Sequence, residues 1–232
     1  MKRMPLLLCP GLLNDQRLWA HQLDGLADLA EMQVADLTGQ ESIAALANNL
    51  LSKAPDRFAL AGLSMGGYVA FEILRRAPER VDRLALFNTS ARPDTPEATQ
   101  RRLELLDITK RGGFGKIPRP LLATQLHPDH LDLPHIGLVA LAMAETVGAL
   151  GFIHQQTAIM TRPDSRPGLS AVAAPTLVVG GQQDGLTTPA IMQEIADGIP
   201  GARLVLVDHC GHLSPLEQPS VVTALLREWL QS

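Results

Sequence analysis

Aromatic residues and cysteines are scarce in this sequence. Aromatic side chains make up only 3% of the 232 residues, so the core has to be built from aliphatic side chains. The two cysteines, Cys9 and Cys210, lie far apart and do not have the spacing of a metal motif. They fit a reducing compartment, and a reactive thiol at Cys210, beside His209 and His212, is disfavoured.

Long apolar runs and blocks of like charge are also missing. The net charge is −4 without any charged block, which gives no reason to expect a nucleic-acid partner. No apolar run approaches the ~18 residues of a membrane span. Lys2 and Arg3 precede a short apolar run, as in a signal peptide, but Pro5 and Pro10 interrupt it and no small-residue cleavage site follows. We therefore expect a core strand here, a cytoplasmic protein and no membrane partner.

Strand-like and helix-like segments alternate along most of the chain. Short apolar runs predict strands at residues 4–9, 32–37, 57–63, 83–88, 175–180 and 202–208. Amphipathic runs predict helices near residues 19–30, after a capping box at 38–41, and at 68–77, 189–199 and 220–230. This alternation predicts an α/β protein with a parallel sheet covered by helices on both faces.

Residues 91–166 depart from this pattern. Thr95-Pro96-Glu97 predicts a helix start with Pro at the first position, and Gly112-Gly113 predicts its end. Further helical stretches lie near residues 135–148 and 151–161, and no strand signal occurs among them. We interpret residues 91–166 as a helical lid over the carboxyl edge of the sheet. Residues 1–90 and 167–232 then form the α/β core.

A single serine stands between glycines where the third predicted strand ends. Residues 60–71 read LAGLSMGGYVAF and contain the pattern Gly-x-Ser-x-Gly around Ser64. A residue forced to positive φ at a sharp strand-to-helix turn brings its neighbours at −2 and +2 close together, and glycine at both places removes the clash. The pattern alone also fits an ordinary Gly-rich turn, but its place between strand and helix makes Ser64 a candidate nucleophile.

A serine nucleophile needs a base, and the base needs an orienting acid. His212 follows the last predicted strand and Asp184 follows the strand before it, so both are expected at the same sheet edge as Ser64. Asp36 precedes the serine and Asp208 lies almost inside a strand, so structural roles suit these two better. The order Ser64, Asp184, His212 is the predicted catalytic set.

The remaining histidines fit structural or solvent-exposed roles better. His209 is close to a strand end, and His21 falls on a predicted helix. The predicted lid holds four more: His127, His130, His135 and His154. His127 and His130 resemble a metal pair, but Pro128 breaks the helix between them and no third ligand is evident. We therefore expect no metal and no cofactor.

Two backbone N–H groups are candidates for an oxyanion hole. One belongs to Met65, directly after the serine, and the other to Leu12 in the loop CPGLLND after the first strand. Gly11 in that loop lets the backbone approach a substrate closely.

Four stretches together resemble the α/β-hydrolase fold superfamily, in its proline-iminopeptidase, haloperoxidase and esterase-like branch. They are PGLLNDQRLW, LAGLSMGGYVAFEILRRAPERV, PTLVVGGQQDGLTTP and DHCGHLSPLEQP. The resemblance implies a mainly parallel, doubly wound sheet with a helical lid inserted between strands. It also implies that the first strand matches the family's third, so that the sheet is of a trimmed kind.

The resemblance implies the same site residues as the pattern. These are a triad of Ser64, Asp184 and His212, with Leu12 and Met65 at the oxyanion hole. Many relatives have His-Gly where this chain has Pro-Gly after the first strand. The backbone donor should survive this change, whereas a supporting hydrogen bond from the missing histidine is lost.

The expected function is hydrolysis of a small or medium carboxylic ester through an acyl-enzyme on Ser64. Hydrolysis of a thioester, an amide or a C–C bond, and acyl transfer to an alcohol, would use the same groups and remain alternatives. A non-catalytic ligand-binding protein of this fold is the alternative from another class. The expected partner is a small-molecule acyl substrate, and a homodimer is left open. Apolar lid residues could line a pocket or pack between helices: Phe114, Leu141, Met143 and Phe152.

Overall fold

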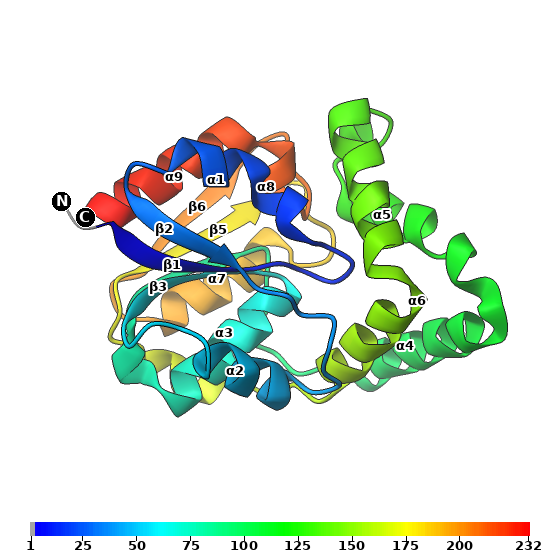
Figure 1. The fold of residues 1–232 in the computed structure, drawn as a ribbon, viewed down its shortest axis with the longest axis horizontal. Coiled ribbons are helices and arrows are strands. Elements are labelled where there is room, and N and C mark those ends of the chain that lie inside the picture. Colours follow the sequence, from blue (N-terminus) through cyan, green and yellow to red (C-terminus); the bar gives the residue numbers. More distant parts are fainter. Residues whose placement is uncertain (1–2) are drawn as a thin grey trace.

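The protein contains one six-stranded parallel sheet (Figure 1). The computed structural model describes residues 3–232, and Lys2, part of the stretch compared with a signal peptide, lies outside the described residues. The strand order is β2-β1-β3-β4-β5-β6, and each neighbouring pair is parallel. The strands are β1 (Met4–Cys9), β2 (Ala30–Val34), β3 (Phe58–Leu63), β4 (Val81–Phe87), β5 (Thr176–Gly181) and β6 (Arg203–Val207). The predicted α/β fold is confirmed.

Alternate side chains of each central strand enter two different hydrophobic cores. In β3, Phe58 and Leu60 join the core on one face of the sheet, whereas Ala59, Ala61 and Leu63 join the core on the other. All six residues of β3 are buried. Burial on both faces explains why these strands appear in the sequence as continuous apolar runs rather than as alternating ones.

Helices cover both faces of the sheet (Figure 1). One face carries α2 (Ile43–Leu51), α3 (Met65–Arg76) and α7 (Pro189–Gly198). The other carries α1 (Ala20–Gly25), α8 (Ser214–Glu217) and α9 (Pro219–Gln231). Short 3-10 turns adjoin them at η1 (Gln16–Trp19) and η2 (Pro78–Arg80). This arrangement is the doubly wound sheet that the sequence predicts.

Two predicted helix starts differ from the structure. The N-cap of α2 is Ser42, whose hydroxyl accepts the Ala45 N–H, so the capping box expected at residues 38–41 is wrong. Thr38 instead donates its N–H and hydroxyl to Asp36, which holds the loop after β2. Helix α3 begins at Met65, directly after Ser64, and not at the predicted residue 68.

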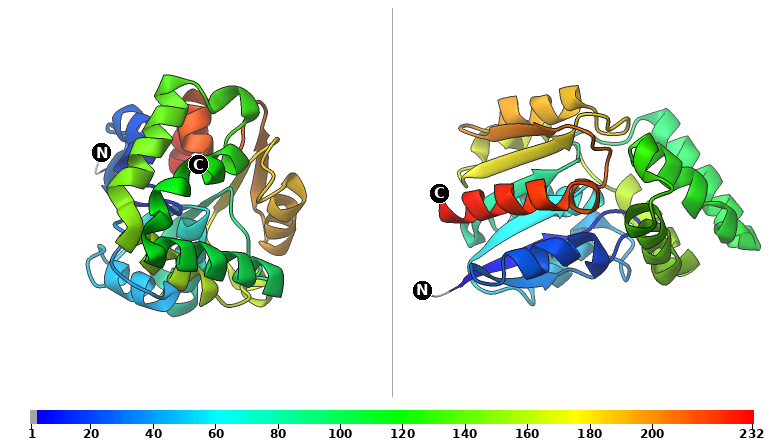
Figure 2. Two further views of the ribbon diagram at one scale, coloured as in Figure 1. Left: turned by 90° about the vertical axis from the view of Figure 1, so that its right-hand side faces the viewer. Right: turned by 90° about the horizontal axis from the view of Figure 1, so that it is seen from above.

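A helical segment lies between β4 and β5 in the chain, and within the described residues it contains no strand. It comprises α4 (Pro96–Ile108), η3 (Thr109–Gly113), η4 (Phe114–Lys116), α5 (Pro118–Gln125), η5 (Pro128–His130), η6 (Pro134–Leu138), α6 (Val139–Met160) and η7 (Arg166–Ala171). Helices α4, α5 and α6 project beyond one end of the sheet, opposite the two chain ends (Figure 2). We call residues 91–166 the cap; these boundaries stay a prediction.

One helical stretch of the cap is unusually apolar. By length and composition alone, the 27 residues of Pro134–Met160 could cross a membrane, which differs from the sequence expectation of no such segment. The core helices of soluble proteins pass the same test, and 39% of the apolar window is buried within the protein. Gly148, at φ +68°, also breaks α6 in its middle. Met143 and Phe152 are fully buried, so packing between helices accounts for them.

Candidate active site

Ser64 occupies a strained turn between β3 and α3. Its backbone has φ +53° and ψ −113°, a conformation that costs a residue with a Cβ roughly 1–3 kcal/mol. A Cβ on Gly62 would lie 2.4 Å from the Gly66 carbonyl oxygen, and one on Gly66 would lie 2.1 Å from the Cys9 carbonyl oxygen. Both glycines are therefore required by close backbone contacts around the serine.

The backbone of Ser64 is held from β4. Its N–H donates to the Phe87 carbonyl at 3.0 Å, and its carbonyl accepts the Thr89 hydroxyl at 2.8 Å. The serine itself is half-buried. The neighbouring strand thus fixes the turn in place and leaves the side chain accessible.

His212 and Asp184 form a buried pair at the same edge of the sheet. The Nδ1 atom of His212 lies 2.7 Å from Oδ2 of Asp184, and the two residues are each 3% exposed. Asp184 follows β5 and His212 follows β6, so the two parallel strands deliver both side chains to their carboxyl ends. The structure brings together these two members of the predicted set.

Asp184 is ionised and fixed by its surroundings. Burial alone would raise the pKa of Asp184, but the charge and hydrogen bond of His212, with hydrogen bonds from Thr187 and Asn88, hold it well below its usual range. Oδ1 accepts the N–H groups of Leu186 at 2.8 Å and Thr187 at 3.0 Å. Oδ2 accepts the Thr187 hydroxyl at 2.5 Å. The carboxylate can therefore hold one imidazole orientation and stabilise its protonated form.

Asn88, which sequence reasoning missed, ties this acid to the loop of His212. It follows β4 at φ +42°, is fully buried, and donates its amide to Asp184 Oδ2 at 2.9 Å and to the Gly211 carbonyl at 3.1 Å. Its Oδ1 accepts the Ser214 hydroxyl at 2.6 Å. The only sequence signal is its place directly after a buried strand.

Ser64 and His212 share the sheet edge but are not joined. Among the described residues, no hydrogen bond links the Ser64 hydroxyl to the His212 ring. Catalytic hydrogen bonds are often long before substrate binds. Because Nδ1 of His212 faces Asp184, its Nε2 is the ring atom left for a proton from a nucleophile.

The loop after β1 lies directly against the serine. A Cβ on Gly11 would lie 3.3 Å from the Cβ of Ser64, so this backbone passes close to the nucleophile position. Within residues 3–232, the N–H groups of Leu12 and Met65 have no hydrogen-bond partner in the protein. The next residue, Leu13, is at φ +60° and donates its N–H to Oε1 of buried Gln155 in the cap at 2.9 Å. The two predicted oxyanion donors are thus free, in a loop braced by the cap.

Neither cysteine is a candidate nucleophile. Burial raises the pKa of the Cys9 thiol to about 12. Burial, together with the carboxylates of Glu217 and Asp184, raises the pKa of the Cys210 thiol even further. Both thiols are protonated at neutral pH and therefore unreactive.

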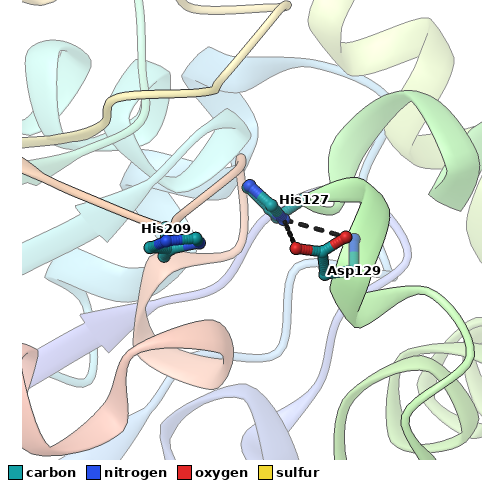
Figure 3. A group of neighbouring side chains, drawn as sticks. All are labelled: His127, Asp129 and His209. Carbon is teal, nitrogen blue, oxygen red and sulfur yellow. Dashed lines mark hydrogen bonds and ion pairs between the residues drawn. The ribbon is translucent and has the colours of Figure 1, made fainter.

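One group of side chains has the residue types of a metal site. The ligand atoms of His127, Asp129 and His209 lie within 4.8 Å of one another, where the cap meets the loop after β6 (Figure 3). In the sequence, His127 and His130 resemble a metal-binding pair, but no third ligand is evident. His130 instead faces Glu217. Asp129 and His209 are exposed, and Nδ1 of His127 already accepts the Asp129 N–H at 3.2 Å.

The rival acids have structural roles, as the sequence suggests. Asp36 caps the turn after β2, and Asp208 accepts the side-chain amide of Gln183 at 3.1 Å. A cleft of about 830 Å³ lies elsewhere, at the opposite edge of the sheet where β3, β4 and β5 begin. Its lining includes Phe71, Val81 and Leu169 but neither Ser64 nor His212.

A parallel sheet of this order, a serine at a strained strand-to-helix turn and a buried His–Asp pair are together characteristic of α/β hydrolases. The model of the alpha/beta hydrolase family matches residues 6–225, and the chain belongs to that family.

Individual proteins similar to this chain are named as esterases or as a lactonase. A thermophilic esterase from Thermogutta terrifontis superimposes with a TM-score of 0.90 at 32% identity, covering 98% of this chain and 89% of that chain. The enol-lactonase from Burkholderia xenovorans LB400 has a TM-score of 0.89 at 24% identity, covering 100% and 93%, and shows the fold alone. A pimeloyl-(acyl-carrier protein) methyl ester esterase from Aromatoleum aromaticum is 26% identical over 215 residues, 81% of this chain and 79% of that protein. These similarities support a hydrolase.

Proposed function

We propose that this protein is a serine hydrolase that cleaves a small or medium carboxylic ester through an acyl-enzyme on Ser64. The observation that carries the proposal is the strained serine, which shares a sheet edge with the buried Asp184–His212 pair. The esterase names of some relatives support an ester, whereas other relatives are named putative carbamate hydrolases.

In the proposed reaction, Nε2 of His212 accepts the Ser64 proton while the serine oxygen attacks the ester carbonyl carbon. The N–H groups of Leu12 and Met65 donate to the oxyanion that forms. His212 then returns the proton to the leaving alcohol, and the acyl group stays on Ser64. Water, deprotonated by His212, then attacks the acyl carbonyl carbon, and His212 returns that proton to the Ser64 oxygen as the bond to the acid breaks. Asp184 keeps the proton of the neutral imidazole on Nδ1 throughout.

The substrate, the compartment and the partners are also part of the proposal. A small acyl compound is the proposed substrate, in a cytoplasmic protein that needs neither nucleic acid nor a membrane partner. Acyl transfer, thioester or C–C hydrolysis would leave the same acid–base assignments in place, and a ligand-binding protein without catalysis would need none of them.

Fluorophosphonate labelling tests the nucleophile. We expect the wild-type protein to be labelled on Ser64, and the folded variants Ser64→Ala and His212→Ala to be unlabelled. His209→Ala, which changes an exposed histidine of the same loop, is the matched control and should be labelled as in the wild type. A wild-type protein that is not labelled would favour the ligand-binding alternative, and labelled Ser64→Ala would rule out the assignment.

A panel of p-nitrophenyl esters of increasing acyl length then tests the substrate class. The proposal expects kcat/KM to be highest for short or medium chains. Turnover of thioesters with no turnover of matched oxyesters would contradict the ester assignment while leaving Ser64 as nucleophile.

A further inference from the structure

Glu217 is a buried carboxylate for which the reaction above has no use. It is the last residue of α8, the short helix directly after the His212 loop, and its side chain has no exposed surface. It belongs to the stretch DHCGHLSPLEQP, in which His212 is the predicted base. Burying a carboxylate is costly unless hydrogen bonds compensate for the lost water.

The carboxylate holds the backbone on both sides of the base. Oε1 of Glu217 accepts the N–H of Leu213 at 2.9 Å, and Oε2 accepts the N–H of Gly211 at 3.1 Å. These residues flank His212 in the chain. The peptide units that determine where the imidazole points are therefore attached to one rigid anion.

The same carboxylate also holds the cap. Oε2 accepts the N–H of His127 at 2.8 Å and lies 2.9 Å from Nδ1 of His130. Three groups from the two parts of the chain converge on Oε2, and the Leu213 N–H alone uses Oε1. Glu217 is thus the shared acceptor where the cap meets the His212 loop.

Backbone contacts at this junction leave little room for adjustment. The His212 N–H donates to the Gln125 carbonyl at 2.6 Å. A Cβ on Gly211 would lie 2.4 Å from that same oxygen and 2.6 Å from the His127 nitrogen. A shift of either segment would be transmitted directly to the other.

We propose that Glu217 is a positioning residue for His212. Glu217 fixes the loop so that Nδ1 of His212 contacts Asp184 and Nε2 of His212 faces Ser64. Through its contacts with the cap, it also makes the end of α5 and η5 a support for this loop. The proposal rests on the proposed function, since it assigns Glu217 a role in the orientation of the base. A glutamine here would keep one acceptor oxygen and place an NH2 group against a backbone N–H in place of the other, so the isosteric change removes one acceptor without removing volume.

Steady-state kinetics of Glu217→Gln provide the first test. Glu72→Gln is the matched control, because Glu72 is also a buried carboxylate but pairs with Arg75 and Arg76 on α3. At a temperature where circular dichroism shows all proteins folded, we expect Glu217→Gln to lower kcat about 10- to 100-fold, as misplacement of a reacting group by about 1 Å does. KM should stay within about twofold of wild type, and Glu72→Gln should change neither constant.

A wild-type kcat per folded molecule in Glu217→Gln would overturn the proposal and leave Glu217 with a role in stability alone. Should Glu217→Gln fail to fold, Glu217→Asp keeps the charge and withdraws the oxygens by one methylene. We then expect a lower kcat with unchanged KM, and an unchanged kcat would overturn the proposal equally.

A spectroscopic readout separates this proposal from the function on which it rests. We expect the proton between His212 Nδ1 and Asp184 to give a downfield proton NMR signal whether or not the protein turns over an ester. Glu217→Gln should shift or broaden that signal and Glu72→Gln should not; an unchanged signal in Glu217→Gln overturns the positioning role. If Glu217→Gln shifts the signal but the fluorophosphonate never labels Ser64 in the wild type, the acyl-enzyme proposal is rejected. The positioning of His212 by Glu217 is then retained.

Discussion

At the scale of single residues, Asp184 shows how a buried acid can be kept charged. Its two oxygens accept hydrogen bonds from backbone, hydroxyl, amide and imidazole groups, so the ionised form is solvated by the protein instead of by water. Thr187 contributes two of these donors. The charged state of this acid is what gives His212 a fixed tautomer.

Asp184→Asn is therefore expected to lower kcat by about 10⁴, because an amide no longer enforces the tautomer that leaves Nε2 free to accept a proton. Initial rates on the best ester of the panel measure the loss. Asp208→Asn is the control, because Asp208 is exposed and lies close to His212 in the chain, and this variant should retain activity. Comparable rates for Asp184→Asn and wild type would contradict the role of the acid.

The same acid should make stability depend on pH. Because the folded pKa of Asp184 is depressed, its contribution is fully present above the ordinary pKa of about 3.9 and is lost as pH falls toward the folded value. Urea unfolding of wild type and Asp184→Asn should thus give a difference in free energy of unfolding that narrows as the pH falls from about 5 to about 3. A difference that stays constant or widens over this range would contradict the assignment.

At the scale of secondary-structure elements, the strand-to-helix turn depends on glycines for close packing and not for flexibility. Gly66 touches the end of β1, and Gly67 lies against Thr89, where a Cβ would be 2.3 Å from the hydroxyl oxygen. Helix α3 can therefore begin immediately after the serine and lie against the sheet.

Gly66→Ala is expected to destabilise the protein by about 1–3 kcal/mol, since the new methyl group meets a backbone carbonyl that cannot move freely. The urea midpoint at constant m-value measures this change. Gly39→Ala is the control, because a Cβ there meets no atom within 4 Å, and it should stay within about 0.5 kcal/mol of wild type. Equal midpoints for the two variants would show that the turn has room to adjust.

The middles of the elements could be predicted from the sequence, whereas several ends could not. Apolar runs mark the central strands because both of their faces are buried, and they also mark the edge strands β2 and β6, which are partly exposed. The start of α3 was missed because Gly66 and Gly67 look like turn residues until their close neighbours are known. The start of β4 at Val81 depends on pairing with Phe58 and on the irregular register that follows.

The same limit applies to the site. Order along the chain was enough to propose Ser64, Asp184 and His212, because parallel strands place their following loops at one edge. Asn88 and Gln155 were missed because their importance lies in partners remote in sequence, such as Gln155 and Leu13, which are 142 positions apart. No local pattern carries that information.

At the scale of the whole molecule, the cap supports both loops on which the proposed chemistry depends. Gln155 of α6 holds the loop after β1, and Gln125 at the end of α5 holds the loop after β6. The cap is consequently a structural support for both loops.

Replacing Gln155 with leucine tests this arrangement, because the Leu13 N–H then has no acceptor, at a cost of about 1–3 kcal/mol for an unpaired buried donor. We expect Gln155→Leu to lower kcat about tenfold or more through the displaced Leu12 donor, with the pH dependence of the rate unchanged. Gln100→Leu, on an exposed position of α4, is the control. Equal kcat values in both variants would show that the cap does not position the loop.

The placement of the cap between β4 and β5 also bears on the order in which the chain folds. Strands β1 to β4 all precede the cap in the chain, so this part of the sheet can assemble without closing the cap connection. Pairing of β4 with β5 must close the long helical connection first, and closure of a long loop is slow. We therefore expect the turn at Ser64 to form early and the loops of Asp184 and His212 to fold last. The three side chains would then come together only in the completely folded protein.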